Sequence, residues 1–268
     1  MPELPDVEVF RRLAERHCLH RDITQTGVPD PASLKGTSAV ALSRRLRGRA
    51  LQACRRHGKF LFLEFADAVT LAMHFGTNGA LRFVGHGQSE PRYTRVWLEF
   101  SDGGRLAYVN PRRIGHVQAI ADIAGFVAEA GLGPDALDPG FSFATFAAAF
   151  AGSRQSVKAV LMDQTRMAGI GNIYSDEILF QARLHPAVSG YSLDPPTQRR
   201  LFEAMQSVLH MAVNSGIGAE AFPDHLPRGF LLPERHTDGR CPRCGAHIRS
   251  FKRGGRTAYY CPKCQPEP

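Results

Sequence analysis

The sequence lacks any apolar run long enough to cross a membrane. No stretch approaches the roughly 18 uncharged apolar residues of a spanning helix, and the mean hydropathy is −0.22. The first six residues include two acidic ones and no basic segment followed by an apolar one, so we expect no secretory signal peptide. Repeats and low-complexity tracts are absent. The composition also excludes collagen, coiled coils and disulfide-rich miniproteins.

Acidic residues are outnumbered by basic ones. The chain has 33 Lys and Arg against 25 Asp and Glu, a net charge of +8, and a pI near 9.5. Such a surface attracts nucleic acid, acidic lipid headgroups or acidic proteins, although a merely soluble cationic surface remains an alternative. With 268 residues, 43% of them hydrophobic, the chain can bury one large core or two smaller ones, which excludes disorder throughout.

Cysteines are few and unevenly placed. Four of the six form two close pairs near the C-terminus, and Cys18 and Cys54 stand alone. Without a signal peptide we expect a reducing, cytoplasmic compartment, where disulfides are rare. We therefore expect Cys18 and Cys54 to be small core or half-buried residues.

Hydrophobic periodicity predicts an α+β chain of several parts. Residues 4–18 have the spacing of an amphipathic helix. Short strand-like runs then follow, separated by turn signals, at 59–65, 69–75, 81–84, 95–100 and 105–109. Many short strands of this kind indicate a β-sandwich or barrel. After a linker at 131–140 the pattern becomes helical over 141–151, 157–165, 173–182 and 196–214, and a Gly/Pro-rich loop follows at 215–233.

The four C-terminal cysteines have metal-ligand spacing. They form C-x2-C-x16-C-x2-C and are Cys241, Cys244, Cys261 and Cys264. Two residues between thiolates allow both sulfurs to reach one ion, and two such knuckles complete a tetrahedron. Because four cysteines leave no open coordination position, we expect one structural zinc ion, without which so small a unit would hardly fold.

The same segment is strongly basic. Its cationic residues are Arg243, Arg249, Lys252, Arg253, Arg256 and Lys263. Gly254-Gly255 suits a hairpin tip that presents Arg256. Such a finger fits a DNA groove or phosphates; a solvated hairpin is the alternative.

A glycine-rich turn separates two of the helical segments. Residues 167–174 read Met-Ala-Gly-Ile-Gly-Asn-Ile-Tyr. A dinucleotide-binding loop is excluded because the third glycine is missing and a helix, not a strand, precedes the turn. Backbone N–H groups at the start of the next helix, with Asn172, could hold a phosphate. A purely structural turn is equally open.

The N-terminus offers a second chemical possibility. Removal of Met1 would leave Pro2 with a free secondary amine, and terminal amines have an ordinary pKa of about 8. Amines attack carbonyl carbons to give iminium intermediates, and Glu3 offers a carboxyl for acid catalysis. Taken alone, the same residues also fit an inert tail.

Together these motifs resemble the formamidopyrimidine-DNA glycosylase/endonuclease VIII family over essentially the whole chain. The segments that carry the resemblance are 1–8, 58–59, 74–79, 110–115, 132–134, 161–164, 168–174 and the ribbon ending at 264–265. The resemblance implies a catalytic β-sandwich domain with an N-terminal helix (1–125), a helix–two-turn–helix DNA-binding domain (132–216), a variable loop (217–236) and a four-cysteine zinc finger (237–268).

The resemblance also implies a mechanism of base-excision repair. A damaged, oxidised nucleotide is everted from DNA. Pro2 attacks C1′ as the base leaves, Glu3 protonates the opening sugar, and the iminium permits β- and then δ-elimination. Site roles are carried over as follows: Lys59 in phosphate binding and proton transfer, Asn172 and Arg256 in phosphate binding, Arg256 also in δ-elimination, and Lys158 as a further basic DNA contact. For Lys59 a surface strand-start lysine, and for Lys158 a solvated helix residue, are the alternatives. For His74 a core position and a site role are both open.

The chain departs from the family at the lesion wedge. The family usually fills the gap left by the everted base with Met, Arg and Phe, where this sequence has Thr77, Arg112 and Ile114. The usual Lys-His stretch is replaced by residues 92–95, Arg-Tyr-Thr-Arg. These changes leave the terminal amine intact and put the substrate in question.

The leading interpretation is a DNA glycosylase with AP-lyase activity that acts on damaged or distorted double-stranded DNA. We expect a monomer in the bacterial cytoplasm, associated with the nucleoid and without a membrane partner. The alternative is a catalytically weak or silent DNA-damage-binding protein on the same scaffold. A zinc-ribbon module for RNA or protein contact would leave the first 235 residues unexplained.

Overall fold

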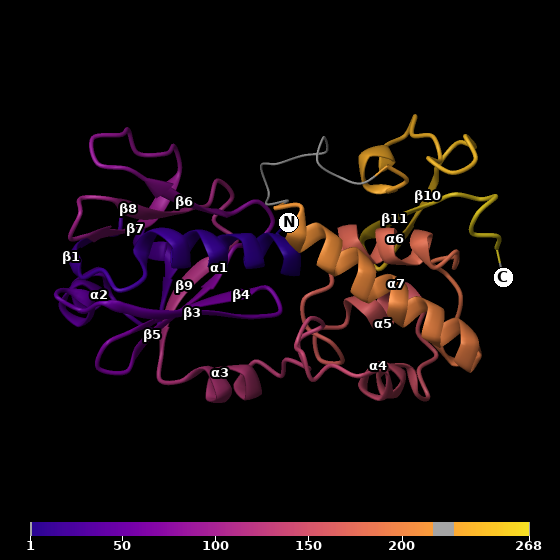
Figure 1. Cartoon of the computed structure of the whole chain (residues 1–268), viewed down its shortest axis with the longest axis horizontal. Coiled ribbons are helices and arrows are strands. Elements are labelled where there is room, and N and C mark those ends of the chain that lie inside the picture. The colour runs from indigo at the N-terminus through magenta and orange to yellow at the C-terminus, as the bar shows by residue number, and fades with distance from the viewer. Residues whose placement is uncertain (1, 217–227, 268) are drawn as a thin grey trace. The chain divides into compact units, whose positions relative to one another are not determined.

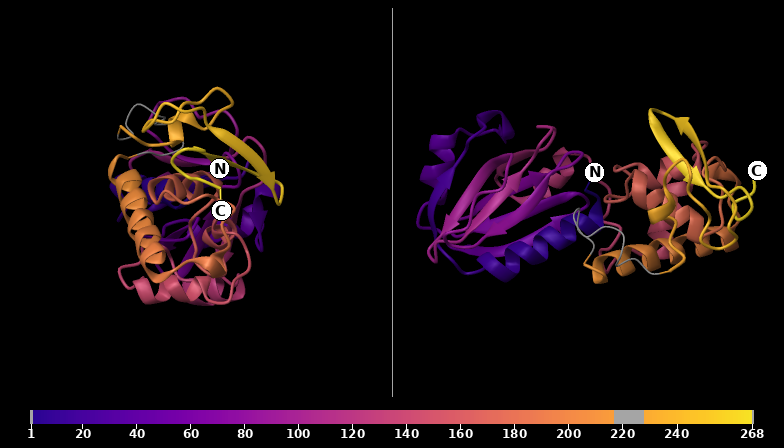
Figure 2. Two further views of the ribbon diagram at one scale, coloured as in Figure 1. Left: turned by 90° about the vertical axis from the view of Figure 1, so that its right-hand side faces the viewer. Right: turned by 90° about the horizontal axis from the view of Figure 1, so that it is seen from above.

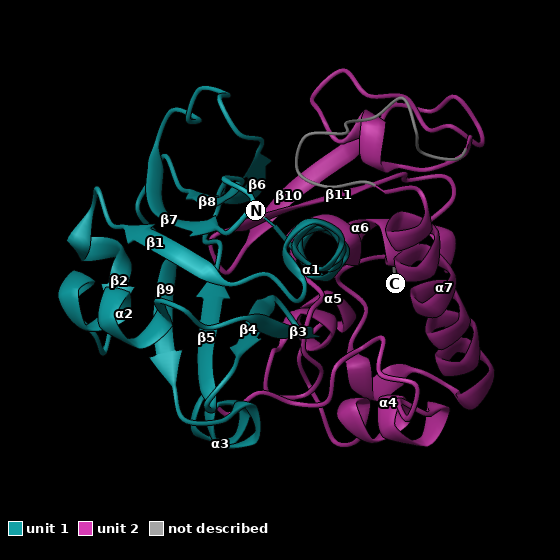
Figure 3. Cartoon of the chain, turned by 60° about the vertical axis from the view of Figure 1, so that its left-hand side comes forward, with its two compact units in different colours: residues 1–130 teal, residues 131–268 magenta. Residues whose placement is uncertain are grey.

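The computed structural model describes residues 2–216 and 228–267. The chain divides into two compact units, residues 1–130 and 131–268 (Figure 3). Of the loops expected over 215–233 and 217–236, residues 217–227 lie outside the described residues. No helix in the described ranges is both long and apolar enough to cross a bilayer.

Unit 1 is built on two β-sheets (Figure 1). The first has the order β1 (Ile23–Gly27), β7 (Thr94–Phe100), β8 (Arg105–Val109), β6 (Ala80–Val84). The second has the order β2 (Leu34–Lys35), β9 (His116–Ile120), β5 (Val69–His74), β4 (Phe60–Phe65), β3 (Leu51–His57). All pairs are antiparallel except β2 with β9. The predicted sandwich is confirmed.

The interior of unit 1 is apolar and aromatic. Strand β7 alternates strictly between buried and partly exposed positions, as expected for a strand with one face toward a core. Phe62, Phe75, Phe100 and Tyr108 are each at most 2% exposed. Burial of such large rings is the main stabilising term of a β-sandwich.

Helix α1 (Leu4–Cys18) lies along the sheets of unit 1 and packs against β3, β4 and β6 (Figure 1). It begins in a capping box formed by Glu3 and Asp6, which satisfies backbone N–H groups of the first turn. Its buried residues recur at helical spacing and are Leu4, Pro5, Asp6, Val7, Phe10, Ala14 and Cys18. As predicted, Cys18 and Cys54 are buried.

Six strands and α-helices of unit 1 were not predicted from the sequence. They are β1, β2, β3, β9, α2 (Ala39–Leu46) and α3 (Ile123–Glu129). Strand β3 buries only Leu51 and Cys54 among basic and polar neighbours, so it lacks the apolar alternation of a strand. No residue of α3 is fully buried. Short, half-exposed elements of this kind are specified by their tertiary neighbours rather than by periodicity.

Unit 2 contains four principal helices: α4 (Phe143–Phe150), α5 (Val157–Met162), α6 (Asn172–Gln181) and α7 (Pro195–Asn214). Side chains of Ser142, Ser156 and Asp194 cap α4, α5 and α7. Helix α5 ends three residues before the predicted boundary. There Asp163 accepts hydrogen bonds from the N–H and hydroxyl of Thr165 at 3.0 and 2.7 Å, a local turn that competes with helix.

The C-terminal part of unit 2 carries a β-hairpin of β10 (Arg249–Arg253) and β11 (Arg256–Tyr260), which extends from the helices (Figure 2). Gly254 and Gly255 form its turn with φ of +56° and +74°. Positive φ at both turn positions matches the right-handed twist of the strands and favours glycine. The described residues also include three short 3₁₀ helices: Pro31–Ser33, Gly190–Ser192 and Leu232–Glu234.

Candidate nucleic-acid repair site

In unit 1, the first residues of the chain include two buried acidic side chains close to Pro2. Pro2 is buried and Glu3 is 0% exposed. The backbone N–H of Glu3 donates to Asp6 Oδ2 at 2.8 Å. Burial, and then the negative charge of Glu3, raise the pKa of Asp6 to about 7, although the N–H of Glu3 opposes this shift. The first turn of α1 therefore holds two carboxyl groups, one of which takes up a proton near neutral pH.

Lys59 follows the tight turn between β3 and β4. Gly58 adopts φ of +55° there, and Lys59 is half-buried. Burial, and then the charge of Lys59, lower the pKa of His74 to about 4. His74 is therefore neutral at pH 7, and its Nδ1 accepts from the N–H of Gly76 at 3.3 Å. Its ring packs on Phe60, with centroids 4.9 Å apart.

The loops that carry the three wedge positions pack closely together in unit 1. A Cβ on Gly76, whose φ is +61°, would lie 2.7 Å from the nitrogen of Gly115, so only glycine permits this approach. Ile114 is 55% exposed, Arg112 is exposed and Thr77 is half-buried. Thus the structure presents an arginine and an aliphatic side chain to solvent at two of these positions, and no aromatic ring.

In unit 2, the glycine-rich turn is braced by one side chain. Gln164 Nε2 donates to the carbonyls of Met162 and Ile170, both at 2.8 Å, and its Oε1 accepts from the N–H of Gly169 at 3.0 Å. Helix α6 then begins at Asn172. Among the residues described, Oδ1 of Asn172 is a buried atom without a hydrogen-bond partner. The turn thus fixes the start of α6.

A buried charge cluster lies directly beneath Asn172. Asp176 is 0% exposed and accepts from the Lys158 ammonium, from Arg235 Nη2 at 2.8 Å and from the Tyr259 N–H at 3.2 Å. Lys158 and Arg235 also each donate to the Asn172 carbonyl at 3.4 Å. The cluster connects α5, α6 and β11, so it ties the start of α6 to the finger hairpin. Lys158, 7% exposed, points inward at this carboxylate.

No role for Asp176, Arg235 or Asp6 was predicted from the sequence. A usable signal existed for Asp176, because it and Glu177 interrupt an otherwise apolar helix directly after the glycine turn. Both acids are completely buried, and burial raises the pKa of Glu177 to about 7. Buried acids need partners, and the basic residues of the ribbon and of α5 are the available ones. Arg235 lay in a segment expected to be a loop, although Leu231 close by is 0% exposed.

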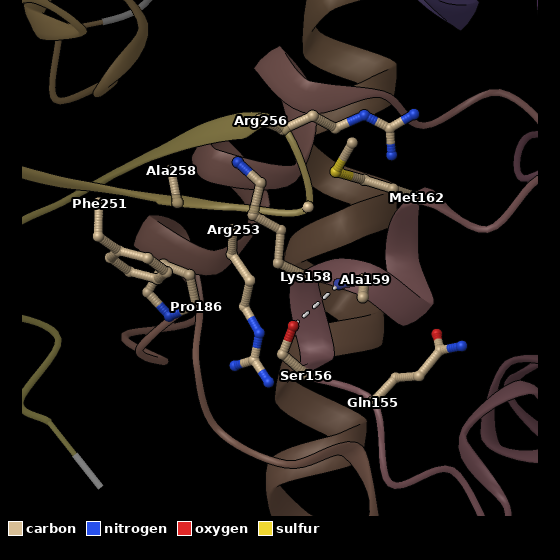
Figure 4. Close-up of a pocket in the computed structure, with 11 residues that line it drawn as sticks. Gln155, Ser156, Lys158, Ala159, Met162, Pro186, Phe251, Arg253, Arg256 and Ala258 are labelled. Atoms are coloured by element: carbon tan, nitrogen blue, oxygen red, sulfur yellow. Dashed lines mark hydrogen bonds between the residues drawn. The ribbon is translucent and has the colours of Figure 1, made fainter.

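A pocket of about 290 Å³ opens between the finger hairpin and α5 (Figure 4). Its cationic lining residues are Lys158, Arg253 and Arg256, and its walls include Phe251 and Met162. In Figure 4 Arg253 extends toward Ser156, whereas Arg256 extends past Met162. Within the described ranges, neither arginine side chain has a hydrogen bond or ion pair with another residue. Both guanidinium groups are therefore available to an anion.

The four predicted metal ligands converge. Their sulfur atoms all lie within 4.8 Å of one another, with Cys241–Cys264 at 3.8 Å and Cys244–Cys261 at 3.5 Å. A tetrahedron with zinc–sulfur bonds of about 2.3 Å has sulfur–sulfur edges of about 3.8 Å. The thiolates fit one structural zinc ion, which would hold the two knuckles together and leave no open position for catalysis.

Three family models cover most of the chain. Residues 1–117 match the formamidopyrimidine-DNA glycosylase N-terminal domain, 132–222 match its H2TH domain, and 239–266 match the zinc finger found in FPG and IleRS. The chain belongs to the formamidopyrimidine-DNA glycosylase family. It is thus a DNA glycosylase of base-excision repair, as the sequence motifs had indicated.

Individual relatives agree with this assignment. The formamidopyrimidine-DNA glycosylase of Acidothermus cellulolyticus is 34% identical over 100% of this chain and 98% of its own length. That of Thermus thermophilus is 35% identical, with 100% and 99% covered. The Lactococcus lactis formamidopyrimidine-DNA glycosylase, solved noncovalently bound to DNA with an AP site, superposes with a TM-score of 0.87 at 27% identity, covering 99% of this chain and 100% of that one.

Proposed function

We propose that this protein removes damaged bases from DNA and then cleaves the abasic site through an iminium formed by Pro2. The observation that carries the proposal is the arrangement of the first turn of α1, where Pro2 directly precedes a completely buried carboxyl, Glu3. A binding protein has no need of such a pair. The uncharged amine of Pro2 is the nucleophile in such a reaction.

The proposed reaction proceeds in three steps. The nitrogen of Pro2 attacks C1′ of the lesion nucleotide, and the bond from C1′ to the base breaks. Glu3 delivers its proton to the ring oxygen of the sugar, which opens and leaves an iminium between Pro2 and C1′. Loss of the C2′ proton, acidified by the iminium, expels the 3′ phosphate by β-elimination, and a second elimination expels the 5′ phosphate.

Phosphate binding is assigned to Lys59 and Arg112 in unit 1 and to Asn172 and Arg256 in unit 2. Arg112 and Arg256 are exposed, and Asn172 presents an amide at the start of α6, where phosphates bind favourably. Lys158 lines the same pocket as Arg256, and we assign it a positioning role through its ion pair with Asp176. These contacts support a damaged duplex as the partner, in agreement with the DNA-bound Lactococcus lactis relative.

Borohydride trapping tests the proposal. The reagent reduces an iminium to a stable amine, so incubation of the enzyme with abasic-site DNA should give a covalent protein–DNA adduct. An uncleaved N-terminal tag should abolish the adduct, because the Pro2 nitrogen is then an amide. Full trapping with the tag in place would assign the nucleophile to a lysine such as Lys59. Complete absence of trapping with a verified Pro2 terminus would support the silent DNA-binding alternative.

A further inference from the structure

One aromatic ring of unit 1 is exposed in a position that its backbone does not favour. Tyr93 is 41% exposed and has φ of +67°, which is costly for a bulky side chain. Hydrogen bonds from neighbouring groups hold the backbone in this strained conformation. The Tyr93 carbonyl accepts from the Asn110 N–H at 3.1 Å, and Thr94 closes the turn onto the Pro91 carbonyl through its N–H at 3.3 Å and its hydroxyl at 2.8 Å.

The turn that carries Tyr93 is fixed to the loop that carries Arg112 and Ile114. Asn110 is 0% exposed, and its Nδ2 donates to Tyr108 Oη at 2.9 Å. Arg95 Nε donates to the Asn110 carbonyl at 2.9 Å. Asp30 forms ion pairs with Arg95 at 3.6 Å and with Arg113 at 2.8 Å. The two loops therefore form one rigid surface.

The charge around the ring is positive. The Arg92 guanidinium lies 4.6 Å from the centroid of the Tyr93 ring and that of Arg95 lies 5.8 Å from it. Arg92 and Arg112 are exposed, whereas the nearby acid Asp30 is buried and already paired. An exposed aromatic ring among arginines is the chemistry that stacks nucleobases and neutralises phosphates.

We propose that Tyr93 stacks on an unpaired base of the distorted duplex and so supplies the aromatic surface that Ile114 does not. The proposal rests on the proposed function, because it names the residue with which that enzyme stabilises opened DNA. Base–aromatic stacking is sequence-tolerant. Tyr93 thus favours DNA in which a base is already unpaired, whatever that base is.

The test uses a duplex with a tetrahydrofuran abasic-site analogue opposite 2-aminopurine, whose fluorescence falls when it stacks. Tyr93→Asn removes the ring and tolerates positive φ, and Tyr93→Phe keeps the ring. We expect Tyr93→Asn to weaken binding by about 5–150-fold, the range of one base–aromatic stack, and to abolish the quenching. Tyr93→Phe should retain both. Val40→Ala, at an apolar side chain that is 78% exposed in α2, is the matched control and should bind like the wild type.

Equal affinity and equal quenching in the wild type and Tyr93→Asn would overturn the stacking role. So would an equal loss in Tyr93→Phe, which would assign the effect to the hydroxyl. If Tyr93→Asn instead loses affinity for poly-glutamate while DNA binding is unchanged, the surface serves an acidic protein and the proposal is wrong. Borohydride trapping separates this result from the proposed function. If the wild-type protein forms the trapped adduct and Tyr93→Asn binds DNA equally well, only the stacking role is rejected. If the wild-type protein never forms the adduct, the proposed function is rejected.

Discussion

The two units hold their candidate functional groups by different means. In unit 1, a core of aromatic and aliphatic side chains holds the backbone that carries Pro2, Glu3 and Lys59. In unit 2, Asn172 and Arg256 stand on elements joined by buried charges and by four thiolates. A β-sandwich buries enough apolar surface to support its own loops, whereas a short ribbon does not. Unit 2 should therefore depend on metal and on charge in ways that unit 1 does not.

Removal of the metal should produce the largest contrast. In Cys261→Ser the finger should lose zinc and unfold locally, because metal binding supplies its folding free energy. Affinity for abasic DNA should fall at least about tenfold, since the Arg256 contact and its neighbours are lost together, while the β-sandwich stays folded. Zinc content, circular dichroism and equilibrium binding measure the three effects.

Cys54→Ala is the matched control for the zinc experiment, because it removes a cysteine from unit 1 and should leave zinc content unchanged. A zinc-free Cys261→Ser protein that binds abasic DNA as tightly as the wild type would show that the finger is not part of the DNA-binding surface.

Disruption of the buried charge cluster should have the next largest effect. Asp176→Asn leaves the charges of Lys158 and Arg235 buried without their counter-ion, which typically costs about 3–5 kcal/mol. Glu64→Gln in unit 1 breaks a largely exposed pair with Arg55, whose side chain is 66% exposed, and should cost less than about 1 kcal/mol. Urea unfolding of the zinc-loaded proteins compares them. Equal losses would remove the proposed difference between the units.

Sequence reasoning succeeded where chemistry is local. The C-x2-C spacing, the Gly-Gly hairpin tip and the helical periodicity of residues 4–18 each specify a structure within a few residues. Contacts between residues that are distant in the sequence could not be predicted. Asp176 and Arg235 are separated by 59 positions along the chain, and nothing in either segment names the other. Strand β3 was not predicted for the same reason, because its polar sequence becomes a strand only by pairing with β4.

The candidate site divides in the same way. Sequence motifs name Pro2, Glu3 and Asn172 as candidate site residues, and their roles stay predictions, whereas the groups that hold them in place could not be named. The direction of the Lys158 side chain depends on a carboxylate 18 residues away. The exposure of Tyr93 depends on a left-handed turn that periodicity does not indicate. Positioning residues are therefore the class that only the structure reveals.

Titration of Asp6 should make unit 1 sensitive to pH despite its apolar core. The pKa of Asp6 in the folded protein, about 7, lies above its ordinary value of 3.8. Between these values the unfolded chain loses the proton and the folded chain keeps it, so this group's contribution to the free energy of unfolding falls as pH rises from about 4 to about 7. The fall is at most about 4 kcal/mol by linkage. Asp6→Asn should flatten this part of the pH profile in thermal unfolding, and an unchanged profile would exclude Asp6 as its source.

The last expected effect concerns the wedge positions of unit 1. Ile114 cannot stack as an aromatic ring does, and Thr77 is too short to fill the space of an everted base. The protein then recovers less of the free energy needed to open a well-paired duplex. The missing stacking is worth about 1–3 kcal/mol, which would slow eversion by about 5–150-fold. We therefore expect excision of 8-oxoguanine opposite cytosine to be slower than cleavage of abasic or unpaired sites, where opening costs least.

Thr77→Met combined with Ile114→Phe should restore part of the wedge. Because Tyr93 is proposed to supply stacking already, the gain on paired 8-oxoguanine should lie near the lower limit, about fivefold, with abasic-site cleavage unchanged. Single-turnover kinetics on matched oligonucleotides measure both rates, and Val40→Ala again provides the unaltered control. Wild-type cleavage of paired 8-oxoguanine as fast as of an abasic site would mean that the lost wedge side chains do not limit eversion. A comparable gain on both substrates would place the effect of the substitutions on binding rather than on opening of the duplex.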